Sequence, residues 1–133
     1  MKAGKNARVL LAEDNLINQK VAVQILATLG YRADLAANGL EVLQALERQP
    51  YDIILMDVQM PEMDGLEAAR RLVARQPDRT RRPWIIALTA NAVQGDREIC
   101  LDAGMDDYIS KPISREDLAA ALERVHRHPG TDA

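Results

Sequence analysis

The stretch IILMDVQMPEMDG, from Ile53 to Gly65, decides how the chain is expected to fold. Its first four residues, 53–56, are all apolar, which is typical of a strand buried on both faces in a parallel sheet that helices cover. Asp57 follows directly, where such a strand would leave the sheet. A carboxylate there is either an ordinary turn former or a reactive group at the rim of the sheet, and the rest of the chain decides between the two.

Four more short apolar runs are separated by helical patterns, so strands and helices alternate along the chain. The other strands are expected at 8–12, 31–36, 84–89 and 105–110, and the helices are expected to begin near residues 16, 38, 64, 91 and 114. Strict alternation implies right-handed crossovers and an α/β doubly wound fold, with a parallel sheet between two layers of helices. We expect one domain over residues 1–133, with a core at about 7–127 and frayed ends.

The helix boundaries carry recognisable signals. Ile17, Val21, Ile25 and Leu29 recur every four residues and predict the apolar face of the first helix. Gly30 follows as a C-terminal glycine. Capping boxes are expected where Asn38 precedes Glu41 and where Asp64 precedes Glu67.

Composition and charge narrow the class of protein. The formal net charge is −3, so the chain as a whole is not a polyanion binder. Cys100 is the single cysteine, which excludes an internal disulfide and fits a reducing compartment. No apolar run approaches the roughly 20 residues of a membrane span, and the N-terminal sequence lacks the apolar segment of a signal peptide. We therefore expect a cytoplasmic module that makes no membrane contact of its own.

Functional residues in an open parallel sheet gather at the carboxyl ends of the strands. The predicted strand ends carry three carboxylates, a hydroxyl and an ammonium, which belong to Glu13, Asp14, Asp57, Thr89 and Lys111. Carboxylates that close together repel one another unless a cation offsets them, and oxygen ligands suit Mg²⁺. A lysine opposite such a metal ion would complete a clamp for a phosphoryl group.

Four motifs stand at these strand ends: LLAEDN at 10–15, ILMDVQMPEMDG at 54–65, ALTAN at 87–91 and DYISKPI at 107–113. Together they resemble the receiver domain of two-component response regulators, and their amino-acid sequences are most similar to those of receivers of hybrid sensor histidine kinases. The resemblance covers nearly the whole chain. It implies a flavodoxin-like (βα)₅ fold whose five parallel strands, numbered along the chain, lie in the order 2-1-3-4-5.

The resemblance also implies a role for each residue of the cluster. Asp57 would be the phosphoacceptor, attacking a phosphohistidine in line. Glu13 and Asp14 would hold Mg²⁺ together with Asp57 and the backbone carbonyl of Gln59. Lys111 would pair with a phosphoryl oxygen.

Further family positions complete the expected site. The backbone of Ala90 would contact the phosphoryl group, and the Thr89 hydroxyl would turn toward it. Tyr108 would then swing inward behind Thr89 as a switch. The peptide bond before Pro112 would be cis, as X–Pro bonds sometimes are. Two family positions that tune hydrolysis of the acyl phosphate are occupied by Gln59 and Asn91.

The expected function is that of a phosphoacceptor module in a two-component phosphorelay. The partners would be a histidine kinase or a histidine phosphotransfer domain, and the rest of a hybrid kinase chain, which could tether the domain to a membrane-bound sensor. The sequence has no kinase dimerisation or ATP-binding segment, so we do not expect it to phosphorylate itself from ATP. The reactions that the domain would catalyse are the transfer of a phosphoryl group to itself and its own dephosphorylation. Direct nucleic-acid binding is not expected.

Two alternative functions make different demands on the sequence from those of a phosphoacceptor module. An aspartyl phosphatase of the haloacid dehalogenase type needs a second Asp two residues after the nucleophile, and Gln59 stands there. A receiver-shaped protein-binding module that is never phosphorylated should have lost an acidic residue or the lysine, and this sequence retains them all.

Overall fold

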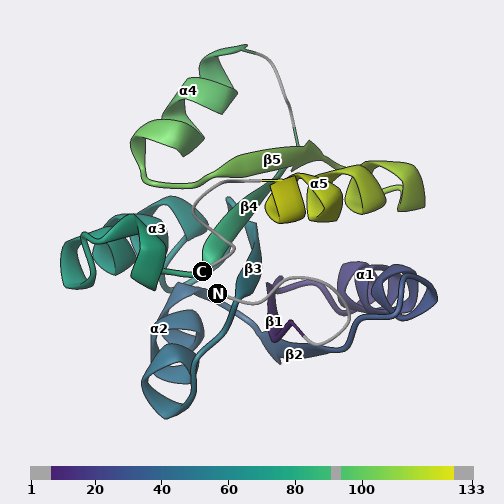
Figure 1. Cartoon of the computed structure of the whole chain (residues 1–133), viewed down its shortest axis with the longest axis horizontal. Coiled ribbons are helices and arrows are strands. Elements are labelled where there is room, and N and C mark those ends of the chain that lie inside the picture. The colour runs from purple at the N-terminus through teal and green to yellow at the C-terminus, as the bar shows by residue number, and fades with distance from the viewer. Residues whose placement is uncertain (1–6, 91–93, 128–133) are drawn as a thin grey trace.

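A computed structural model describes residues 7–90 and 94–127 of the chain and contains one parallel sheet of five strands. The strands lie in the order β2-β1-β3-β4-β5, which confirms the predicted topology (Figure 1). Their bounds are β1 (Val9–Ala12), β2 (Ala33–Ala36), β3 (Ile53–Asp57), β4 (Trp84–Thr89) and β5 (Asp107–Ser110). All four neighbouring pairs run parallel, as the βα alternation requires.

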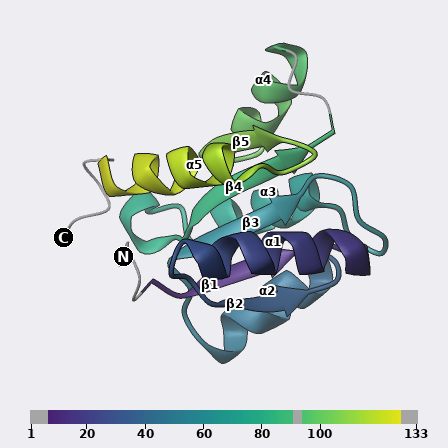
Figure 2. The same cartoon turned by 90° about the vertical axis from the view of Figure 1, so that its right-hand side faces the viewer.

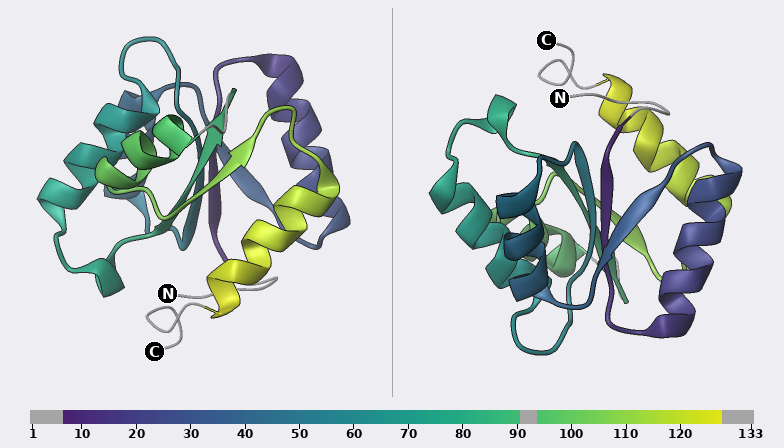
Figure 3. Two further views of the ribbon diagram at one scale, coloured as in Figure 1. Left: turned by 90° about the horizontal axis from the view of Figure 1, so that it is seen from above. Right: turned by 90° about the horizontal axis from the view of Figure 1, so that it is seen from below.

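Helices cover both faces of the sheet. The helices are α1 (Leu16–Thr28), α2 (Gly39–Arg48), α3 (Gly65–Arg75), α4 (Gln94–Asp102) and α5 (Arg115–Arg127), and a short 3₁₀ helix, η1 (Arg79–Arg81), precedes β4. Helices α1 and α5 pack side by side on one face, which is turned toward the viewer in Figure 2. Helices α2, α3 and α4 cover the other face, and Figure 3 shows the sheet between the two layers.

Strand β3 lies at the centre of the sheet and of the hydrophobic core. Ile54 and Met56 point into the core under α2, α3 and α4, while Ile53 and Leu55 point into the core under α1 and α5. All four side chains are fully buried, which confirms the prediction made from the apolar run 53–56. Asp57 is the last residue of β3, so the strand does end on the carboxylate.

The predicted apolar face of α1 is confirmed at its end, where Ile25 and Leu29 pack against the core, and is wrong at its start. Ile17 is 72% exposed and Val21 is 43% exposed, while Ala22 and Leu26 are the buried residues of the helix. A helix turns about 100° per residue, so a spacing of four residues drifts by about 40° at each step. Over the three steps from Ile17 to Leu29 this drift reaches about 120°, which carries the start of the stripe off the sheet.

The helix starts follow the predicted capping signals. Asn38 and Asp64 accept hydrogen bonds from the backbone N–H of Glu41 and Glu67 at 2.9 and 2.8 Å, each three residues into its helix. Gly30 follows α1 with φ of 89°, a left-handed conformation in which glycine is favoured. Among the described residues, no helix is long and apolar enough to cross a membrane.

Candidate functional site

The carboxyl ends of four strands meet at one rim of the sheet. The register pairs Ala12 of β1 with Met56 of β3, and Asp57 of β3 with Leu88 of β4. It also pairs Thr89 of β4 with Ser110 of β5. Because the strand ends are level, the residues that end or follow them are brought together. These are Glu13, Asp14, Asp57, Thr89 and Lys111, as the sequence predicted.

Three carboxylates form a compact acidic cluster. Oxygen atoms of Glu13, Asp14 and Asp57 lie within 4.8 Å of one another. Glu13 and Asp57 are buried, whereas Asp14 is exposed. Oxygen ligands at this spacing are suited to a hard divalent cation such as Mg²⁺, which binds through one or two carboxylates and keeps several waters. The residues therefore fit the metal ion that the resemblance implies.

One ammonium group offsets part of this negative charge. Nζ of Lys111 lies 2.7 Å from Oδ2 of Asp57 and 3.1 Å from Oε1 of Glu13. Partial burial by itself lowers the pKa of Lys111, but hydrogen bonds and charge from Asp57 and Glu13 outweigh burial and raise the pKa above its ordinary value. The lysine is therefore a cation throughout the neutral range, and its stabilising contribution is lost only as the pH rises through this raised pKa, above 10.5.

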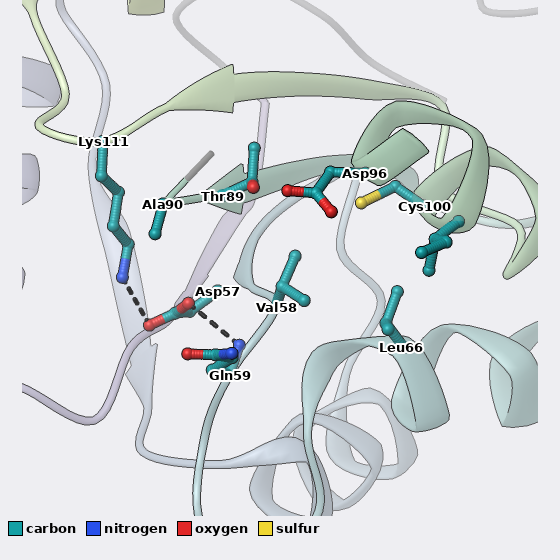
Figure 4. A pocket seen from close by; sticks show the side chains of 10 residues that line it. Asp57, Val58, Gln59, Leu66, Thr89, Ala90, Asp96, Cys100 and Lys111 are labelled. Carbon is teal, nitrogen blue, oxygen red and sulfur yellow. Dashed lines mark hydrogen bonds and ion pairs between the residues drawn. The ribbon is translucent and has the colours of Figure 1, made fainter. Parts of the chain in front are cut away.

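The Asp57 carboxylate is held at both of its oxygens. Oδ2 accepts from Lys111, and Oδ1 accepts a hydrogen bond of 3.1 Å from the backbone N–H of Gln59 (Figure 4). Both contacts fix the direction of the carboxylate at the end of a rigid strand. The side chain of Gln59 is itself exposed. Asn91, the other position that the resemblance associates with hydrolysis, lies outside the described residues.

The conformation of the loop after Asp57 explains why a glycine, Gly65, stands at the end of the stretch 53–65. Gly65 is buried against the backbone of Asp57, and a Cβ atom at this position would collide with the Asp57 carbonyl oxygen. The Gly65 N–H donates to the carbonyl of Val58 at 2.9 Å, which closes the loop onto the end of β3. Glu62 turns the loop with φ of 67°. The Met-Pro-Glu-Met-Asp-Gly segment thus folds back so that α3 starts directly beside the end of β3.

A cleft of about 360 Å³ opens between this rim and helix α4. Asp57, Thr89 and Lys111 line one side of it, and Ala90, at the end of β4, is exposed beside them. Asp96 and Cys100, four residues apart on α4, line the other side (Figure 4). The sequence patterns did not predict that Asp96 and Cys100 line a cleft, because the position of α4 over the strand ends depends on tertiary packing.

Thr89 and Tyr108 lie on the same face of the sheet. Tyr108 pairs with Ala87, and Thr89, two residues further along β4, pairs with Ser110. Thr89 is buried, Tyr108 is half-buried, and Ala87 between them is small and fully buried. The Thr89 carbonyl accepts a hydrogen bond of 2.7 Å from the Lys111 N–H, and the peptide bond that follows Lys111 is cis, as the resemblance implies.

Comparison with known proteins agrees with this geometry. A sequence profile of the response regulator receiver domain matches residues 9–123. The chain is 44% identical over 129 residues to hybrid signal transduction histidine kinase K of Dictyostelium discoideum, covering 91% of this chain and 10% of the relative. The chain therefore belongs to the response regulator receiver domain family.

Two solved structures are similar over most of their length. The receiver domain of sensor histidine kinase PA1611 from Pseudomonas aeruginosa PAO1, with a magnesium ion coordinated in its active-site cleft, is 49% identical with a TM-score of 0.78, covering 92% of this chain and 97% of that chain. The receiver domain of Ssk1, crystallised with the histidine phosphotransfer protein Ypd1 of Saccharomyces cerevisiae, is 30% identical with a TM-score of 0.81, covering 91% and 89%. The chain spans between 5% and 10% of the length of three curated relatives that it matches at 44–45% identity.

Proposed function

We propose that this receiver domain accepts a phosphoryl group from a phosphohistidine onto Asp57. The supporting observation is the placement of Asp57, which lies at the end of a rigid strand with Lys111 at 2.7 Å and two further carboxylates beside it. An Oδ atom of Asp57 attacks phosphorus as the bond from phosphorus to the imidazole nitrogen breaks. The electron pair of that bond leaves with the imidazole, and Lys111 neutralises charge on the phosphoryl oxygens.

The same residues would hold Mg²⁺. Glu13, Asp14 and Asp57 would supply carboxylate oxygens, and Gln59 would supply its backbone carbonyl. A bound Mg²⁺ would offset the negative charge of the cluster and of the incoming phosphoryl group. The three carboxylates and Lys111 support this assignment, because three clustered negative charges with a single ammonium group leave net negative charge at the rim.

Three other residues would respond to the phosphoryl group. The Thr89 hydroxyl and the backbone N–H of Ala90 would donate to phosphoryl oxygens, and Tyr108 would move toward the space beside Thr89. Support comes from the cleft that reaches from Asp57 past Thr89 and from the shared sheet face of Thr89 and Tyr108.

The proposed phosphodonor is a histidine phosphotransfer domain or a histidine kinase that docks beside α1. Helix α1 begins directly after the acidic residues, and its first two side chains, Leu16 and Ile17, are 70% and 72% exposed. Val21 adds a third exposed apolar side chain. Exposed apolar side chains that are neighbours on one helix and adjoin a reactive site are typical of a protein interaction surface.

Ile17→Ser should therefore slow phosphotransfer from a purified phosphorylated histidine phosphotransfer protein, such as Ypd1. Labelling by acetyl phosphate, which needs no protein partner, should be unchanged. Leu35→Ser is the matched control, because Leu35 is 50% exposed on the edge strand β2. Equal slowing by both substitutions would contradict docking at α1.

We further propose that the chain is one receiver domain of a cytoplasmic signalling protein, with its core at about 7–127. A hybrid histidine kinase is the proposed parent, since three curated relatives matched at 44–45% identity are histidine kinases and are far longer. The lone cysteine supports a reducing compartment.

Intact-mass measurement tests the phosphoacceptor directly. Acetyl phosphate with Mg²⁺ should add a single phosphoryl group to the chain, and Asp57→Asn should abolish the addition. Asp102→Asn, at an exposed carboxylate at the end of α4, should label like the parent. Undiminished labelling of Asp57→Asn would refute the assignment. No labelling of the parent by any donor would favour the alternative, a protein-binding module that is never phosphorylated.

A further inference from the structure

The guanidinium group of an exposed arginine on α4 lies over the ring of Tyr108. Cζ of Arg97 is 4.9 Å from the centre of the Tyr108 ring, within the distance of a cation–π contact. Arg97 is exposed and Tyr108 is half-buried, so the contact covers the solvent-facing side of a ring whose other side packs against the core. No other cation is recorded over this ring among the described residues.

The position of Tyr108 leaves the neighbouring cleft open. Thr89, Asp96 and Cys100 line the cleft, and Tyr108 does not. Yet Tyr108 lies on the same sheet face as Thr89, and the residue paired with it, Ala87, carries only a methyl side chain. Arg97 does not line the cleft either, so a ring that turned into the cleft would leave the guanidinium of Arg97.

We propose that Arg97 is a positioning residue that holds Tyr108 outside the cleft and so opposes the response to the phosphoryl group. This inference rests on the proposed function, because it concerns the regulation of the same site. A contact made in only one of two conformations favours that conformation by the free energy of the contact. For a cation–π contact at an exposed position this corresponds to about a two- to fivefold change in the equilibrium.

The prediction is that Arg97→Met tightens the binding of a phosphoryl mimic. The substitution removes the charge and keeps a long apolar side chain at an exposed position, where folding should be unaffected. Calorimetric titration with beryllofluoride at saturating Mg²⁺ should give an affinity about two- to fivefold higher than in the parent. Arg97→Lys, which keeps a cation, should lie closer to the parent, and Arg70→Met, at an exposed arginine of α3, is the control for net charge.

The signals of the Tyr108 ring provide a second measurement, because they would not change if Arg97 only stabilised the fold. In spectra of ring-labelled tyrosine without mimic, Arg97→Met should move the Tyr108 signals toward their positions in the beryllofluoride complex of the parent. The effect of Arg97→Met on affinity should also vanish in the Tyr108→Leu background, because the residue that Arg97 holds is then absent.

The outcomes separate this inference from the proposed function. A parent that fails to bind beryllofluoride with Mg²⁺ overturns both. A parent that binds, with Arg97→Met equal to it in affinity, overturns the inference alone. Equal tightening by Arg70→Met, or tightening that persists in the Tyr108→Leu background, would show that charge rather than the ring contact is responsible, and would likewise overturn the inference.

Discussion

Lys111 reaches from the end of β5 across β4 to Asp57 at the end of β3, and its Nζ lies 2.7 Å from Oδ2 of the carboxylate. The same Nζ is 3.1 Å from Glu13, which follows β1. One side chain therefore links the ends of three strands. Because Glu13 and Asp57 are both buried, this ammonium offsets the charge of two carboxylates in the part of the rim that is shielded from water.

Lys111→Met should accordingly destabilise the metal-free domain. We expect the free energy of unfolding to fall by about 2 kcal/mol, the size of a lost hydrogen bond to a charged group. Saturating Mg²⁺ should recover part of this loss, because a divalent cation offsets the same carboxylates. Urea melts in EDTA and in Mg²⁺ measure both effects. Lys20→Met, at an exposed lysine of α1, should change stability by less than about 0.5 kcal/mol, and equal losses in the two variants would contradict the prediction.

Cys100, on the α4 wall of the cleft, should react slowly with alkylating agents. Burial raises the pKa of its thiol above the ordinary value of 9.0, and the nearby charge of Asp96 raises it further. A raised pKa means less thiolate at a given pH, and the thiolate is the reactive form. The pH profile of iodoacetamide alkylation should therefore have its midpoint above that of a free thiol.

The Asp96→Asn substitution tests the cause of the raised thiol pKa. Removing the carboxylate charge should lower the midpoint of the alkylation profile, although burial should still keep it above that of a free thiol. Asp102→Asn is the control, because Asp102 is an exposed carboxylate on the same helix and does not contribute to the raised pKa. An unchanged midpoint in Asp96→Asn would show that its carboxylate does not face the thiol.

The parts of the site that the sequence predicted are those fixed by backbone geometry. An apolar run such as 53–56 is typical of a buried central strand, and the aligned ends of parallel strands then bring Asp57 and Lys111 to the same rim. Contacts that depend on how a helix rotates or docks were not predictable in this way. The four-residue spacing placed Ile17 on the buried face, and nothing in the local pattern brings Arg97 to Tyr108, since α4 and β5 meet only through tertiary packing.

Trp84 should be a poor reporter of events at the rim. It begins β4, five residues before Thr89, which places it roughly 16 Å from that residue along the strand. Its ring is buried and lies 4.4 Å from the guanidinium of Arg79. Mg²⁺ should leave its fluorescence nearly unchanged, whereas Arg79→Met should alter it. Strong quenching by Mg²⁺ would mean that the position of Trp84 relative to the rim is wrong.

The last prediction concerns the repulsion within the acidic cluster. Asp14 is the exposed member, and its oxygen lies within 4.8 Å of oxygens of Glu13 and Asp57. At that distance each pair of like charges repels by about 1 to 3 kcal/mol between the dielectric limits of water and a protein surface. Asp14 also precedes the start of α1, where a negative charge stabilises by only about 0.3 to 1 kcal/mol. Asn15, which accepts from the N–H of Asn18 at 3.0 Å, is the residue that caps the helix.

Asp14→Ala should therefore act in opposite directions with and without metal. In EDTA the variant should be more stable than the parent, because repulsion is relieved and no helix cap is lost. In Mg²⁺ the parent should gain about 2.7 kcal/mol at a hundredfold excess over Kd, and the variant should gain far less because a ligand is missing. Urea melts of both proteins at fixed ionic strength give all four values. A variant that is less stable than the parent in EDTA would show that the helix interaction outweighs the repulsion, and a variant that gains as much from Mg²⁺ would remove Asp14 from the proposed metal site.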